Sequence, residues 1–169
     1  MSNIPKRDRK ELTTETKVVL ESKQLVSLIT KATLTNQANE QPKIPKRRME
    51  AIGNRLLNNA IDAYEELRYQ DRMYPDTKKS RDTRVAALYR GEKHLSNLVS
   101  DIDLLPYIIP SVNHSENWYN EMQTKAIDTY NHCMRLRQTI EAEYNKINSD
   151  IRKKNSIKSD NTKKSDSTN

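Results

Sequence analysis

The sequence lacks phenylalanine altogether and contains only two glycines and one cysteine among its 169 residues. Two glycines can serve few tight turns, which argues against a β-sandwich or a β-barrel. The single cysteine, Cys133, cannot form an intramolecular disulfide, and this fits a reducing compartment. No apolar run approaches the ~18 residues that a membrane span needs, and the first residues lack the apolar segment of a secretory signal. We therefore expect a cytoplasmic protein with no membrane segment.

Polar and charged residues dominate the composition. The hydrophobic fraction is 34% and the mean hydropathy is -0.99, so the chain can bury one modest seam but not a large enzyme core with a deep pocket. A formal charge of +7 and a pI near 9.4 suggest a polyanionic partner. Residues 1–14 carry a net charge of +2 and residues 148–169 a net charge of +3, which leaves +2 for residues 15–147.

Both ends of the chain lack the pattern of a folded segment. Residues 1–14 are polar and without periodicity, and residues 148–169 consist largely of Ser, Asn, Lys and Asp. Such segments cannot bury enough apolar area to offset their chain entropy. We therefore predict a disordered basic lead over residues 1–14 and a disordered tail over residues 148–169.

Apolar residues at helical spacing predict four helices, over about residues 15–36, 46–73, 81–105 and 115–147. We expect the third helix to begin at an N-cap, Ser80, and to stop at Pro106. Helices with one apolar face that are joined by short linkers can bury that face only against one another. The expected fold is therefore all-α, an antiparallel up-down-up-down four-helix bundle over residues 15–147.

The second predicted helix has the clearest apolar stripe, with apolar residues in steps of three or four at Met49, Ile52, Leu56, Ala60, Ala63 and Leu67. Glycine in a helix interior costs ~1 kcal/mol relative to alanine. Gly53 on this helix therefore suggests a close crossing with a neighbouring helix, the alternative being a tolerated surface glycine. The residues that we expect at the helix contacts are Ile52, Gly53, Leu56, Leu88 and Leu95.

No catalytic or metal-binding constellation is evident. None of His94, His114 and His132 stands at the spacing of a metal pair on one helix face. Neighbouring helical residues such as His132 and Cys133 point about 100° apart. Walker, GxGxxG and GxSxG motifs are missing from the sequence. We expect no enzyme activity, no cofactor and no metal site.

Basic residues are the remaining signal. Between residues 43 and 93 the sequence holds thirteen cations and eight acids. The cations gather at the start of the second helix and from Lys78 to Lys93, where they could neutralise phosphates. The candidate nucleic-acid-binding residues are Lys43, Lys46, Arg47, Arg48, Arg55, Lys78, Lys79, Arg81, Arg84, Arg90 and Lys93. The alternative is a solvated surface of mixed charge.

The stretch "IPKRRMEAIGNRLLNNAIDAYEEL", from Ile44 onward, resembles a helix entry in the accessory variability determinant proteins of diversity-generating retroelements. These belong with the small bacterial four helix bundle proteins. The residues that match the pattern of that group are Pro45, Lys46, Ile52, Gly53 and Arg55. The resemblance covers roughly residues 18–145. It implies a basic homo-oligomeric bundle, pentameric in the best-known branch of the family, that binds the template RNA of a reverse transcriptase.

A shorter stretch, "AIGNRLLNNAIDAY", is similar to relaxosome accessory proteins of mobilisable plasmids, which bind DNA beside a relaxase. Our first hypothesis is a non-catalytic nucleic-acid-binding bundle of a mobile genetic element, accessory to a reverse transcriptase. The alternatives are a DNA-binding mobilisation protein, or a protein-interaction scaffold that binds no nucleic acid. Genomic neighbours would separate the two accessory roles.

Overall fold

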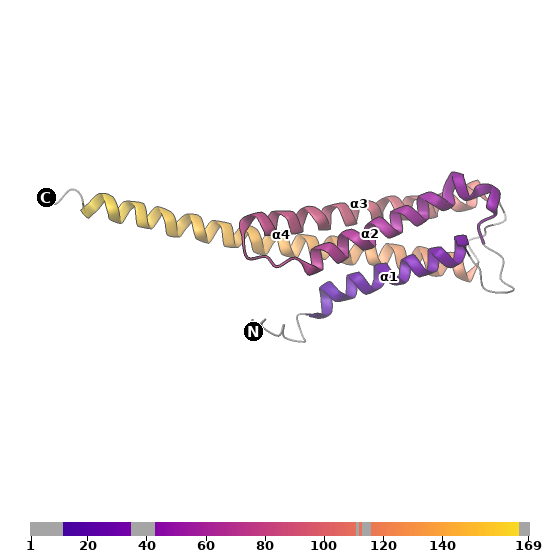
Figure 1. Cartoon of the computed structure of the whole chain (residues 1–169), viewed down its shortest axis with the longest axis horizontal. Coiled ribbons are helices and arrows are strands. Elements are labelled where there is room, and N and C mark those ends of the chain that lie inside the picture. The colour runs from indigo at the N-terminus through magenta and orange to yellow at the C-terminus, as the bar shows by residue number, and fades with distance from the viewer. Residues whose placement is uncertain (1–11, 35–42, 111, 113–115, 166–169) are drawn as a thin grey trace, which may run out of the picture.

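The computed structural model describes residues 12–34, 43–110, 112 and 116–165, and these hold four α-helices and no strand (Figure 1). The helices are α1 (Leu12–Leu34), α2 (Asn54–Arg72), α3 (Lys78–Ile108) and α4 (Asn117–Ser165). A short 3-10 turn (Lys46–Arg48) and a π-helical turn (Met49–Gly53) lead into α2. The prediction of an all-α fold with four helices is therefore confirmed.

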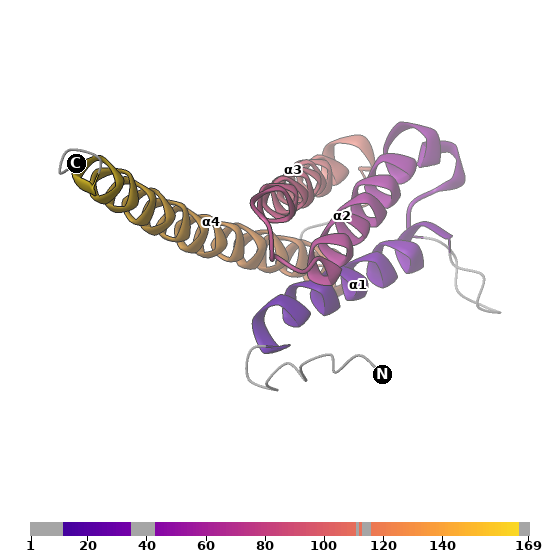
Figure 2. The same cartoon turned by 60° about the vertical axis from the view of Figure 1, so that its left-hand side comes forward.

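The four helices lie side by side around one core (Figures 1 and 2). Helix α2 contacts α1 and α3, and α4 contacts α1 and α3. In three polar pairs that join α2 to α3, a higher residue number on α3 goes with a lower residue number on α2. The pairs are Gln70–Arg84, Glu66–Arg90 and Arg55–Asp101. Pairs between α3 and α4 follow the same opposite order at Asp103–Gln123 and Glu92–Arg137.

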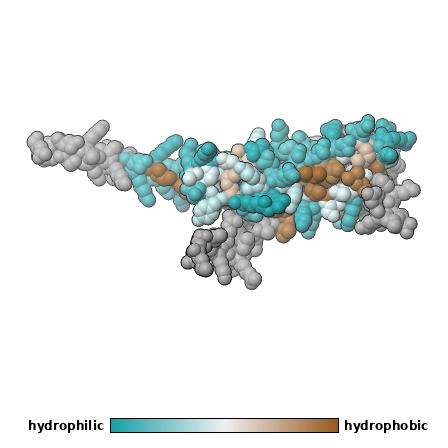
Figure 3. Space-filling model, viewed as in Figure 1, coloured by the Kyte–Doolittle hydropathy of each residue, from teal (hydrophilic) through white to brown (hydrophobic). Residues whose placement is uncertain are grey.

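The core is built from the apolar stripes that the sequence displays. Of the expected packing residues, the aliphatic ones are fully buried, namely Ile52, Leu56, Leu88 and Leu95. Helix α4 adds Tyr119, Met122 and Ala126 to the same core, and α1 adds Leu25 and Ile29. The face seen in Figure 3 is mostly hydrophilic with a few apolar patches. Burial of one face of each helix is what stabilises the fold, because isolated helices are marginal in water.

The close helix crossing lies at Gly91, not at Gly53. A Cβ atom on Gly91 of α3 would lie 3.2 Å from Cδ2 and Cγ of Leu67 on α2. A Cβ atom on Gly53 would instead meet Sδ of Met49, which belongs to the same turn, at 2.5 Å. The expectation that Gly53 permits a close approach between helices is therefore wrong, and Gly91 has that role.

Two expected helix limits are also wrong. Helix α3 begins at Lys78, since Thr77 is its N-cap and accepts the backbone N–H of Ser80 through Oγ1 at 3.1 Å. The Ser80 hydroxyl in turn accepts the Thr77 backbone N–H at 3.0 Å, which completes a capping box. Pro106 lies inside the last turn of α3, which continues to Ile108. A proline this near a helix end removes one hydrogen bond and interrupts little.

Helix α4 continues to Ser165 and projects well beyond the bundle (Figures 1 and 2). This differs from the disordered tail expected over residues 148–169, of which 166–169 lie outside the described residues. The side chains of residues 149–155 are exposed, so burial does not explain this part of the helix. Residues 148–165 contain no Gly or Pro, and oppositely charged residues at Lys146, Asp150 and Lys154 are spaced to pair along one face. At the other end, Leu12 already belongs to α1, and residues 1–11 of the expected lead are outside the described range.

Candidate nucleic-acid interface

The first group of predicted binding residues surrounds the 3-10 turn before α2. We call Lys43, Lys46, Arg47 and Arg48 the basic collar; all four side chains are exposed. The turn is anchored by Ile44, which is fully buried and donates its backbone N–H to the Ala32 carbonyl at 3.0 Å. No collar side chain forms an ion pair with any residue that the structure describes. The collar therefore presents four exposed cations, at and just before one anchored turn, that no described acid neutralises.

The collar lies at the end of the bundle opposite the projecting part of α4 (Figure 1). Pro45 precedes the turn with φ -58° and ψ 139°, which directs the chain from an extended conformation into the turn. The backbone N–H of Arg48 donates to the Pro45 carbonyl at 2.7 Å. These contacts hold the backbone of the collar in place while its side chains remain in solvent.

The second group of predicted residues is already paired with carboxylates. Arg90 donates two hydrogen bonds to Glu66, at 2.7 and 2.9 Å, and the bonded carboxylate raises the pKa of Arg90. Arg55 pairs with the buried carboxylate of Asp101, and Lys78 pairs with Asp82 at 3.4 Å. Because an acid neutralises each of these cations, they attract phosphates less than the collar does.

Arg81 and Arg84 form a third group, and for them the prediction of an accessible binding face is wrong. Only 8% of Arg81 and 5% of Arg84 is exposed. Arg84 donates Nε–H to Oε1 of Gln70 and Nη1–H to the Tyr144 hydroxyl, both at 3.2 Å. The Arg81 guanidinium lies 5.9 Å from the centroid of the Tyr144 ring. These arginines tie α3 to α2 and α4.

The sequence contained a signal for this burial. Arg81 and Arg84 precede Leu88, Gly91 and Leu95 in steps of three and four, so they lie on the stripe that faces the core. A long side chain at such a position buries its methylene groups and needs polar partners for its head. Charge alone, without this register, suggested a surface role.

The last two predicted residues, Lys79 and Lys93, are exposed on α3. The structure also exposes cations that are not among the predicted binding residues. Arg68 and Arg72 stand on the last turns of α2, and Arg152, Lys153 and Lys154 stand on the projecting part of α4. Lys79 and Arg72 flank the connection between α2 and α3, the same end from which α4 projects (Figure 2).

Groups with other chemistry are held in structural contacts. His132 Nδ1 lies 2.8 Å from Oε2 of Glu21, which joins α4 to α1. Burial raises the pKa of the Cys133 thiol to about 12, which keeps it protonated and unreactive at neutral pH. His114 lies outside the described residues. Within the described ranges, no group of three His, Cys, Asp or Glu residues could hold a metal ion, and none of the helices is long and apolar enough to cross a membrane.

The collar has the charge to attract an anion, because its cations are exposed and none of them pairs with an acid in the described ranges. The paired and buried arginines along α2 and α3 instead hold helices together. Comparison with known proteins adds no further guide: no protein-family model, no curated protein and no solved structure matches the chain.

Proposed function

We propose that the chain is a non-catalytic nucleic-acid-binding bundle whose helices run up-down-up-down and whose basic collar neutralises phosphates. One observation carries the proposal: the collar cations Lys43, Lys46, Arg47 and Arg48 are exposed and form no ion pair with described residues. Arg55 and Arg90, by contrast, are paired with acids, and Arg81 and Arg84 are buried. The opposite order of the contacting residues on α2 and α3, and on α3 and α4, supports the up-down-up-down topology.

A single collar offers at most about four phosphate contacts, and each contact releases bound counterions. Binding through one chain is then weak and depends strongly on salt. Assembly of several chains would present several collars to one polymer and increase the affinity by avidity. The proposal therefore includes a homo-oligomer, with a pentamer as one form, that assists a reverse transcriptase on RNA. The alternative is an assistant to a relaxase on DNA.

The test uses the full chain and charge reversal in the collar. Arg47→Glu with Arg48→Glu should weaken binding to a fluorescein-labelled RNA hairpin or DNA duplex in fluorescence anisotropy titrations. The plot of log K against log salt should become shallower by about 2, since two phosphate contacts are lost. The matched control is Lys23→Glu with Arg135→Glu, which makes the same change in net charge at exposed positions on α1 and α4.

If the collar variant and the control lose nucleic-acid affinity equally, then only net charge matters. The collar would then not be a binding site. Whichever of RNA and DNA binds more tightly decides between the reverse-transcriptase and relaxase roles. A protein-interaction scaffold is the second candidate, favoured by the exposed apolar side chains of Ile147 and Ile151 on the projecting part of α4. That candidate predicts no binding to either nucleic acid at physiological salt.

A further inference from the structure

Two exposed tyrosines lie at or beside the connection between α2 and α3. Tyr69, on the last turns of α2, is 51% exposed, and Tyr74, in the connection itself, is 70% exposed. Neither ring stacks on another ring or on a guanidinium in the described part of the chain. Tyr89 and Tyr144, by contrast, each face an arginine. About half of Tyr69, which lies near Arg90, and most of Tyr74 therefore remain in water.

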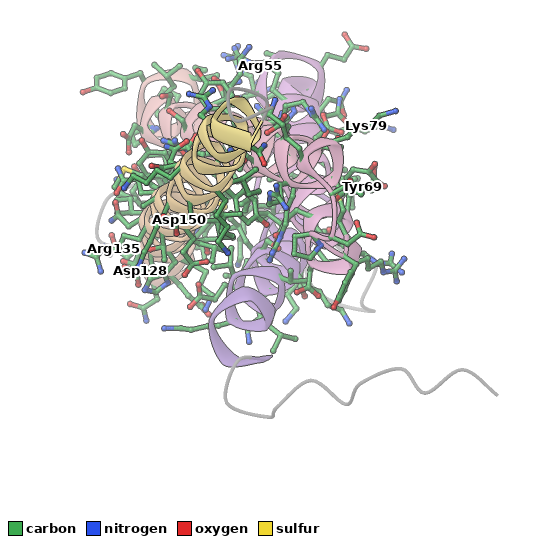
Figure 4. All side chains as sticks on the ribbon, turned by 90° about the vertical axis from the view of Figure 1, so that its left-hand side faces the viewer. Arg55, Tyr69, Lys79, Asp128, Arg135 and Asp150 are labelled. Carbon is green, nitrogen blue, oxygen red and sulfur yellow. The ribbon has the colours of Figure 1, made fainter. Side chains whose placement is uncertain are left out.

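Cations alternate with these tyrosines along the chain. Arg68 and Arg72 are four residues apart on α2 and so share one face of the helix, and Lys79 follows on α3. All three side chains are exposed, and none is in an ion pair with a described residue. Tyr69 and Lys79 extend to the same side of the molecule, although they come from different helices (Figure 4). We call this set of five residues the tyrosine turn.

The backbone of the tyrosine turn is held by hydrogen bonds at both ends. The Met73 N–H donates to the Gln70 carbonyl at 3.1 Å where α2 ends. The capping box of Thr77 and Ser80 fixes the start of α3, and Asp76 accepts the Ser80 hydroxyl at 3.1 Å. A ring displayed from an ordered turn loses less conformational freedom on binding than one on a loose loop.

Acidic neighbours restrict the direction in which an anionic polymer could run. Glu65 and Glu66 lie one turn before Tyr69 on α2, and Glu66 is already paired with Arg90. A phosphate backbone would be repelled on that side of Tyr69. On the other side Arg72 and Lys79 would attract it. The acids near them in sequence include Asp71, which is half-buried, and Asp76, which accepts the Ser80 hydroxyl.

We propose that the tyrosine turn binds single-stranded nucleic acid, with bases stacked on Tyr69 and Tyr74 and phosphates on Arg68, Arg72 and Lys79. Exposed rings interleaved with cations are how proteins hold single strands, because every base has a face that can stack. Bases inside a duplex already stack on one another and offer no such face. The inference rests on the proposed function, since it assigns the strand state of the same class of ligand, but it uses a different surface from the collar.

The experiment compares single and double strands of one sequence on the full chain. Tyr69→Ala with Tyr74→Ala should weaken binding to a labelled 12-nucleotide strand by about thirtyfold in fluorescence anisotropy, because loss of stacking on each of the two rings costs about 1 kcal/mol or more. Binding to the duplex should stay within twofold. Tyr69→Phe with Tyr74→Phe should keep the single-strand affinity, because stacking needs the ring and not the hydroxyl. Tyr107→Ala, at the opposite end of α3 and 81% exposed, is the control and should bind as the wild type does.

The possible results separate this inference from the proposed function. Unchanged single-strand binding in the alanine pair, with collar variants still impaired, would overturn only the tyrosine turn. The same result would point to a protein partner for these rings. Equal losses for strand and duplex would also overturn it, because stacking is selective. A wild-type chain that binds no nucleic acid of either form would overturn both proposals, and circular dichroism on each variant excludes misfolding as the cause of a loss.

Discussion

Two sets of cations that look alike in the sequence, Lys46–Arg48 and the pair Arg81 and Arg84, end in opposite environments. The first surrounds an anchored turn and stays in solvent without ion pairs among the described residues. The second lies between three helices, with Arg84 bonded to Gln70 and Tyr144. The difference teaches that the register of a cation on its helix decides its role more than the local density of charge does. Charges in the core stripe hold the helices together, whereas charges outside it stay in solvent unless an acid pairs with them, as Glu66 does with Arg90.

The strongest way to test this difference is to remove Arg84. Arg84→Ala should lower the free energy of unfolding by about 3 kcal/mol, because the buried amide of Gln70 and the Tyr144 hydroxyl lose a donor. Urea denaturation followed by circular dichroism measures the loss. Nucleic-acid affinity of the folded variant should stay within twofold of the wild type. A large loss of nucleic-acid affinity with little loss of stability would instead show that Arg84 contributes to nucleic-acid binding.

The next test compares two ion pairs that join α2 to α3, Arg55–Asp101 and Arg90–Glu66. Arg55→Ala leaves the carboxylate of Asp101 buried with Asn59 as its remaining described partner, so unfolding should become easier by about 2 kcal/mol. Arg90→Ala should cost less than about 1 kcal/mol, since the Arg90 and Glu66 side chains are 47% and 24% exposed and water screens them. Equal losses in urea titrations would mean that burial of the acid does not set the strength of these pairs.

Much of the fold follows from periodicity, and the exceptions have physical causes. The stripe of α2, including Ile52 and Leu56, was readable because apolar residues in steps of three or four have one way to be buried. The periodicity of apolar residues could not predict the projecting part of α4, because its exposed residues bury no apolar face. Helix propensity and the spacing of opposite charges favour the helix there. The place where α3 begins depended on whether Thr77 or Ser80 caps it, and both are good capping residues.

The candidate site was less predictable than the fold. Counting cations identified the collar, but it also selected Arg55 and Arg90, whose acidic partners Asp101 and Glu66 are distant in sequence. Such pairings need the helix order and register, which no local pattern contains. The tyrosine turn was missed for a related reason. Exposure of Tyr69 depends on which face of α2 the neighbouring helices leave open.

A third test compares the two glycines, Gly91 at the contact between α2 and α3 and Gly53 beside the collar. Gly91→Ala should lower the free energy of unfolding by about 1 kcal/mol, because crowding against the buried Leu67 outweighs the gain in helix propensity. Gly53→Ala should raise it by about 0.5 kcal/mol, since the crowded atom is the end of the flexible Met49 side chain and φ is an ordinary -61°. Thermal denaturation of both variants measures the two signs. A stabilised Gly91 variant would show that α2 and α3 have room to separate.

The smallest expected effect on stability is at the collar itself. Lys46→Ala with Arg47→Ala and Arg48→Ala should change the free energy of unfolding by less than about 0.5 kcal/mol, because none of these side chains is buried or paired with a described residue. Removing three like charges from one turn even relieves some repulsion, and this relief should fade at high salt. Urea titrations at two salt concentrations measure both quantities. A loss above 1 kcal/mol would make the collar part of the fold. No loss, together with weakened nucleic-acid binding, means that the charges serve a partner.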